Sequence, residues 1–97
     1  MESERVARLA AVAERFVVGL RMNEGFDEVL LRQLREEIDR CGAAWRERDE
    51  VPKRGALILA ELYAAIDACA WLYTGETRER IVDAAVEVHE AVVAALD

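Results

Sequence analysis

Few residues of this chain have the type and spacing that metal chemistry needs. It has one histidine, His89, and two cysteines, Cys41 and Cys69. Carboxylate-bridged di-iron bundles use Glu-x-x-His pairs, because residues three apart on a helix point toward the same metal, but Val86 stands three residues before His89. No Cys-x-x-Cys or His-x-x-x-His pair is present to indicate zinc. We therefore expect no metal site and no cofactor.

Nucleophilic and acid–base catalysis are also poorly supported. The only serine is Ser3, outside any Gly-x-Ser-x-Gly motif, and the five glycines are scattered rather than arranged in a phosphate-binding loop. Histidine changes its charge near neutral pH, but no nucleophile motif accompanies His89. We expect His89 to be a buried or interfacial residue, the two cysteines to be reduced core residues, and no residue to be catalytic.

Two enzyme families give the acidic residues a possible role. All-α nucleoside triphosphate pyrophosphohydrolases bind magnesium through Glu-x-x-Glu and Glu-x-x-Asp pairs, whereas Glu61 and Asp67 are six residues apart and point to different sides of a helix. The stretch LRQLREEIDR resembles the opening of α-helical chorismate mutases, which implies an enzyme that clamps two carboxylates with basic residues. The resemblance covers ten residues, and no matching basic set follows it. A small all-α enzyme acting on a nucleotide or metabolite is our third hypothesis.

Length and charge restrict the class of protein. The chain has 97 residues, enough for a single domain over 1–97, and is 54% hydrophobic and 34% charged. Acidic residues outnumber basic ones, 20 to 13, giving a net charge of −7, which argues against nucleic acid. The N-terminus MESERVARLA has no secretory pattern, so we expect a cytoplasmic protein. The apolar run 56–73 contains two acids, each costing about 2.5 to 3.5 kcal/mol at mid-bilayer, so we expect no membrane partner.

Apolar residues recur at helical spacing in four blocks. Turn and capping signals separate the blocks: Gly25 as a helix C-cap, Asp27 as an N-cap, the Val51-Pro52 pair as a break, and Thr74-Gly75 as a stop. These signals predict helices over about 3–23, 27–48, 52–73 and 76–96. Short connections between amphipathic helices are typical of an all-α, four-helix up-and-down bundle.

The third and fourth predicted helices have more apolar surface than one bundle needs. A bundle helix requires an apolar stripe about 100° wide. The third helix has a core face with Tyr63 and Leu72 among its flanking residues, and it has apolar residues on the opposite side as well. The fourth has an apolar arc that covers more than half its circumference. The residues that we expect in a protein interface are Leu57, Ala60, Ala64, Ala68, Trp71, Val82, Val86, His89 and Val93.

A second copy of the chain is the simplest cover for this surface, because two-fold homodimers are the commonest soluble oligomers. The sequence therefore predicts an acidic helical-bundle protein that acts by protein association, as a homodimeric regulatory or adaptor protein without catalytic activity. The alternative is an acidic inhibitor of the immunity or antitoxin type, which captures a basic partner protein by electrostatic steering. Its acidic residues would be Glu76, Glu79, Asp83, Glu87 and Glu90.

Overall fold

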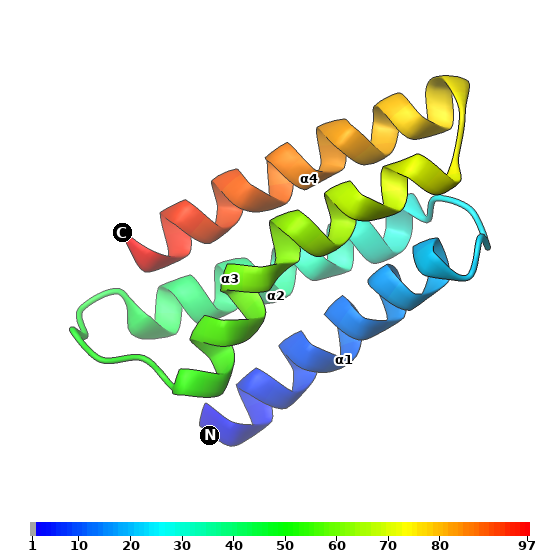
Figure 1. Cartoon of the computed structure of the whole chain (residues 1–97). Coiled ribbons are helices and arrows are strands. Elements are labelled where there is room, and N and C mark those ends of the chain that lie inside the picture. Colours follow the sequence, from blue (N-terminus) through cyan, green and yellow to red (C-terminus); the bar gives the residue numbers. More distant parts are fainter. Residues whose placement is uncertain (1) are drawn as a thin grey trace.

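The computed structural model describes residues 2–97 and is a bundle of four helices (Figure 1). The helices are α1 (Glu2–Arg21), α2 (Glu28–Trp45), α3 (Lys53–Cys69) and α4 (Gly75–Leu96), and a 3-10 turn, η1 (Ala70–Leu72), continues α3. Their directions alternate along the chain. The predicted all-α, four-helix up-and-down bundle is therefore confirmed.

The helices are not neighbours in simple chain order. α1 packs against α2 and α3, and α4 packs against the same two helices. α2 and α3 consequently lie on opposite sides of the bundle, and residues 46–52 cross from one side to the other at the end where the chain termini lie (Figure 1). This long connection explains why α2 ends at Trp45, three residues before the predicted end.

The end of α1 is formed by Asn23 rather than by Gly25. Asn23 has a φ of 60°, and the backbone N–H groups of Asn23 and Glu24 donate to Leu20 and Gly19 at 3.1 and 2.9 Å. This pair of bonds is the Schellman arrangement, which satisfies carbonyls left free at a helix end. Asparagine adopts the left-handed conformation more readily than most residues other than glycine, and the helix stops at Arg21, two residues earlier than predicted.

The start of α2 follows the prediction. The Asp27 side chain accepts hydrogen bonds from the backbone N–H groups of Val29 and Leu30, at 2.9 and 3.0 Å. These bonds satisfy donors that a helix leaves free in its first turn. α4 begins at Gly75, one residue before the predicted start, and Pro52 precedes α3 instead of lying in its first turn.

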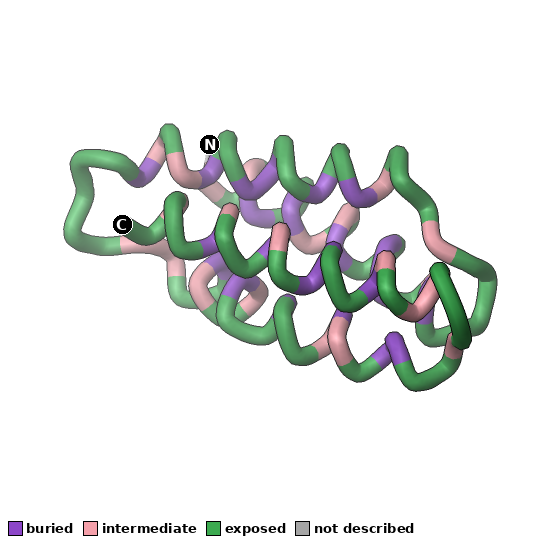
Figure 2. Tube along the Cα trace, turned by 90° about the horizontal axis from the view of Figure 1, so that it is seen from above, coloured by how far each residue is buried: buried purple, intermediate pink, exposed green. Residues whose placement is uncertain are grey.

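The core runs along the bundle axis and receives residues from all four helices (Figure 2). Two glycines allow close approach. A Cβ on Gly42 would lie 2.9 Å from Ala95 Cα, and a Cβ on Gly55 would lie 2.9 Å from Trp45 Cη2, well inside normal contact distance. Trp45 is buried, and its indole N–H donates to Glu2 Oε2 at 2.7 Å. Cys41 and Cys69 are buried free thiols, as predicted.

One helical stretch in the described chain, Lys53–Leu72, is long and apolar enough to cross a membrane by length and composition. Its most apolar window has a mean hydropathy of 1.5. In this structure the stretch is part of a compact globule, because Leu59, Leu62 and Ile66 are core residues. Leu57, Ala60, Ala64 and Ala68 of α3 are exposed and lie outside that core.

Candidate protein interface

The outer side of α3 is apolar and exposed. Trp71 is 77% exposed and Leu57 is 59% exposed, at opposite ends of the helix. Ala60, Ala64 and Ala68 are exposed between them. The two large side chains thus flank a row in which no side chain extends beyond Cβ.

A second apolar row runs along α4. Val82, Val86 and Val93 are 40%, 47% and 53% exposed, and His89 is exposed among them. We expected His89 to be either buried or interfacial. It is not buried within the chain, so a position in an interface remains a prediction. Its ring meets the Tyr63 ring edge-on with centroids 5.6 Å apart. This contact joins the row on α4 to the outer side of α3.

Three exposed residues extend the surface beyond the nine that the sequence predicts. Tyr63 and Leu72 were expected at the flanks of the α3 core face, but they are 42% and 51% exposed; Leu96, near the end of α4, is 48% exposed. We call the whole set the apolar face. It comprises Leu57, Ala60, Tyr63, Ala64, Ala68, Trp71, Leu72, Val82, Val86, His89, Val93 and Leu96.

Most of the exposed large hydrophobic side chains lie on this face. It holds eight of the eleven such residues in the described chain; the others are Val18, Met22 and Val29. Isolated hydrophobic residues are common on protein surfaces, but a large contiguous group indicates a binding surface. The distribution of these side chains therefore marks α3 and α4 as the candidate interface.

Trp71 is held in place at one end of the face. The guanidinium carbon of Arg78 lies 5.1 Å from the centroid of the Trp71 ring, a cation–π contact. The same arginine donates from Nε to the backbone oxygens of Tyr73 and Ala70, at 2.8 and 3.2 Å. An aromatic side chain ordered before binding loses less entropy when a partner covers it.

No ionic contact between described residues involves α3. The ionic contacts between described residues join Glu2 to Arg5 and Arg48, Glu37 to Arg8 and Arg40, Glu87 to Arg35 and Arg80, and Glu28 to Arg80. All of these groups belong to α1, α2, α4 or the connection after α2. Charged contacts therefore cover the other sides of the bundle and leave the outer side of α3 without them.

Glu37 is a buried carboxylate that sequence reasoning missed. It is 6% exposed, and its Oε2 accepts from Arg40 Nη1 at 2.7 Å. Its Oε1 has no hydrogen-bond partner and lies 3.8 Å from Arg8 Nε. The sequence did contain a signal for its burial. Position 37 follows Leu34 by three residues and precedes Cys41 by four, which places Glu37 on the same helix face as these core residues. It forms an ionic connection between α1 and α2.

The potential chemical groups do not converge. No group of three or more His, Cys, Asp or Glu side chains within residues 2–97 is placed to hold a metal ion. Burial raises the pKa of the Cys41 and Cys69 thiols, which reduces the thiolate fraction needed for nucleophilic attack. Neither cysteine has the environment of a reactive thiol.

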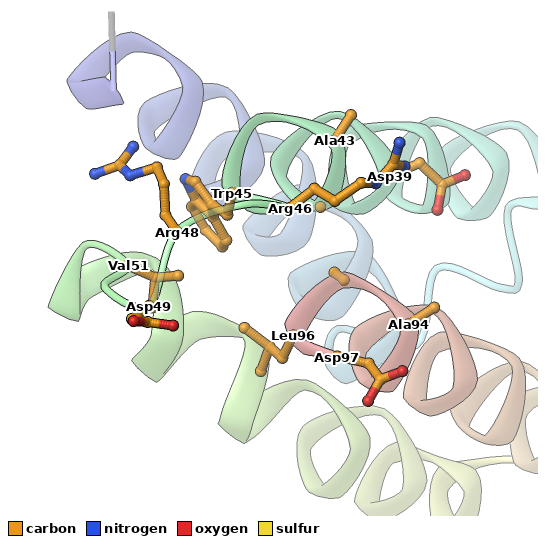
Figure 3. Close-up of a pocket in the computed structure, with 12 residues that line it drawn as sticks. Asp39, Ala43, Trp45, Arg46, Arg48, Asp49, Val51, Ala94, Leu96 and Asp97 are labelled. Carbon is orange, nitrogen blue, oxygen red and sulfur yellow. The ribbon is translucent and has the colours of Figure 1, made fainter.

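A hollow of about 530 Å³ lies at the end of the bundle near the C-terminus (Figure 3). Its wall includes Leu96, Val51 and two arginines. Arg46 extends along α2 beside Asp39, and Arg48 extends toward the start of α1, where it pairs with Glu2 at 3.5 Å. A ligand site needs polar groups that converge on one point, and these do not.

No protein-family model, curated protein or solved structure matches this chain.

Proposed function

We propose that this chain acts through protein association, as a cytoplasmic homodimeric regulatory or adaptor protein without catalytic activity, and that the apolar face is the interface. The observation that supports this most strongly is the gathering of eight exposed large hydrophobic side chains on α3, η1 and α4. Removing such surface from water is the main favourable term in association.

The dimensions of the face suit a stable dimer. Lys53–Leu72 is 20 residues, or about 30 Å at 1.5 Å per residue, and two adjacent helices are about 20 Å wide with their side chains. The projected area is therefore about 600 Å². Accessible area exceeds projected area, so the face approaches the roughly 800 Å² per partner of a standard interface.

A second copy suits the charge of the molecule. Each chain has a net charge of −7, so two copies repel unless the surfaces that meet carry little charge. The outer side of α3 carries one exposed acid, Glu61 at its border, whereas the outer side of α2 is covered by arginine, glutamate and aspartate. Self-association through the apolar face keeps the exposed acidic residues of α1, of α2 and of the connection after α2 in water.

Two valine substitutions test the proposal with matched exposure. Val86 and Val29 are 47% and 49% exposed, but only Val86 lies on the apolar face. We expect Val86→Glu to shift the protein from dimer to monomer in sedimentation velocity, because it buries a charge in the interface. Val29→Glu should leave the dimer intact. A dimer that survives Val86→Glu, or that is lost equally in both variants, contradicts the proposed interface.

The acidic-inhibitor alternative is supported by the charge on α4. Glu76, Glu79, Asp83 and Glu90 are exposed and form no ion pair with any other described residue. Glu87 is the exception in the predicted set, because Arg35 and Arg80 bind it at 3.1 and 2.8 Å. Four carboxylates thus remain available to a basic partner.

A polyarginine peptide is a suitable probe for this alternative. If α4 is a steering surface, the association rate should fall steeply with salt and also on Asp83→Asn with Glu90→Gln. Hydrophobic self-association should change little over the same salt range. A salt-insensitive rate would count against the inhibitor hypothesis without affecting the dimer.

A further inference from the structure

The outer row of α3 and η1 has a large side chain at each end and alanines between them. Leu57 and Trp71 are each seven residues from Ala64, and Ala60 and Ala68 are each four residues from it. All five are exposed. The geometry points to an antiparallel contact between α3 and the α3 of a second copy, with the two-fold axis passing beside Ala64. This inference rests on the proposed homodimer and specifies how its copies meet.

The row on α4 is centred near His89, at nearly the same level of the bundle. Val82 and Leu96 are each seven residues from His89, and Val86 and Val93 lie three and four residues from it. The contact between Tyr63 and His89 places the centres of the two rows at nearly the same height. One two-fold axis, perpendicular to the helices, can therefore pass through both centres.

The sizes of the side chains favour an antiparallel arrangement. It places Ala64 against the partner's Ala64, and Ala60 against the partner's Ala68, so that the helix backbones approach closely. Trp71 then covers the partner's Leu57 at each end of the contact. A parallel arrangement would instead place Trp71 against the partner's Trp71 and leave a gap beside Leu57, so fewer van der Waals contacts would form.

Charge at the start of α3 favours the same arrangement. Lys53 and Arg54 begin the helix, whereas the first turns of α4, beside its other end, hold Glu76 and Glu79 together with Arg78 and Arg80. An antiparallel contact keeps the basic start of one copy away from the basic start of the other. A parallel contact brings Lys53 toward the partner's Lys53, which is unfavourable.

Single cysteine substitutions distinguish the arrangements. In the antiparallel contact, Ala64→Cys places two thiols next to the two-fold axis, so mild oxidation should give a covalent dimer. Ala60→Cys alone should not cross-link, because the paired position is eight residues away, or about 12 Å along the helix, beyond the roughly 7 Å Cα separation that a disulfide spans. A mixture of Ala60→Cys and Ala68→Cys chains should cross-link as a heterodimer.

The native cysteines provide the background control. Cys41 and Cys69 are buried, and burial raises the pKa of both thiols, so they should react slowly at pH 8. The unsubstituted chain should therefore show no covalent dimer under the same oxidation. Each variant is compared with it on a non-reducing gel and by mass spectrometry.

The outcomes separate this inference from the proposed function. Cross-linking of Ala64→Cys and of the mixed pair, with none for Ala60→Cys alone, supports the antiparallel contact. Self-cross-linking of Ala60→Cys overturns it in favour of a parallel one. A non-covalent dimer in which none of these variants cross-links overturns the inference but leaves the homodimer intact. A monomer at all concentrations overturns both.

Discussion

α2 and α3 are helices of nearly equal length on opposite sides of the bundle, with 18 and 17 residues. Each sends a stripe of apolar residues into the core. Their outer sides differ: that of α2 presents Arg32, Arg35, Glu36, Asp39 and Arg40, whereas that of α3 presents alanines and large hydrophobic residues. The fold requires only the inner stripes, so the apolar outer side of α3 needs an explanation outside the single chain.

The largest expected effect tests whether the two inner stripes are equivalent. Ile38 on α2 and Ile66 on α3 are both 0% exposed. Replacing either by alanine should lower the free energy of unfolding by about 2 to 5 kcal/mol, through lost burial and the cavity left behind. Urea denaturation checks this. A much smaller loss for Ile66→Ala would mean that α3 is not a full member of the core.

The outer sides should differ in assembly. Trp71→Ala removes the most exposed large hydrophobic side chain, on η1 at the end of α3, and hot-spot aromatic residues contribute about 2 kcal/mol or more to binding. We expect the dimer dissociation constant to rise by at least roughly 30-fold, measured by sedimentation equilibrium. The matched change on α2, Arg35→Ala, should leave it unchanged. Unchanged assembly for Trp71→Ala would favour the valine row of α4 as the main contact.

A smaller effect concerns the contact between Trp45, at the end of α2, and Gly55 in α3. Gly55→Ala places a Cβ 2.9 Å from Trp45 Cη2, so it should cost about 1 to 3 kcal/mol through overpacking. Gly19→Ala is the control, because its Cβ would meet only Glu24 Oε1, at 3.6 Å. Thermal unfolding compares them. Equal melting temperatures would show that the Trp45 ring moves aside without cost.

The smallest effect concerns the ionic surface of α2. The Arg35 side chain is 50% exposed where it pairs with Glu87, and exposed pairs of this kind contribute about 0 to 1 kcal/mol. Arg35→Ala should therefore change the free energy of unfolding by less than about 1 kcal/mol, with a further reduction of the effect in high salt. A loss of several kcal/mol would show that this surface helps to hold α2 against α4.

The number and type of the helices could be predicted from the sequence because each inner stripe keeps helical spacing. Asp27 was identifiable as an N-cap because its side chain acts within its own turn. The end of α1 was not, because both Asn23 and Gly25 can adopt positive φ and the sequence does not rank them. The diagonal placement of α2 and α3 depends on packing between helices that are not consecutive in the chain, α1 with α3 and α2 with α4.

The candidate interface was predictable in part. The sequence places Leu57, Ala64 and Trp71 opposite the α3 core face, and all three are exposed. The exposure of Tyr63 and Leu72 could not be predicted. Both were expected at the flanks of the α3 core face, where the positions of the neighbouring helices decide whether a side chain is buried or exposed. The direct contact of Tyr63 with His89 required the relative height of α3 and α4, which no local pattern specifies.

Native mass spectrometry of the unsubstituted protein tests the central claim most directly, because it reports the number of subunits and any retained ligand in one experiment. The account predicts twice the mass of a 10.9 kDa chain with no added mass, at low micromolar concentration. A monomer across the micromolar range would contradict it, and would mean that the apolar face serves another partner or none.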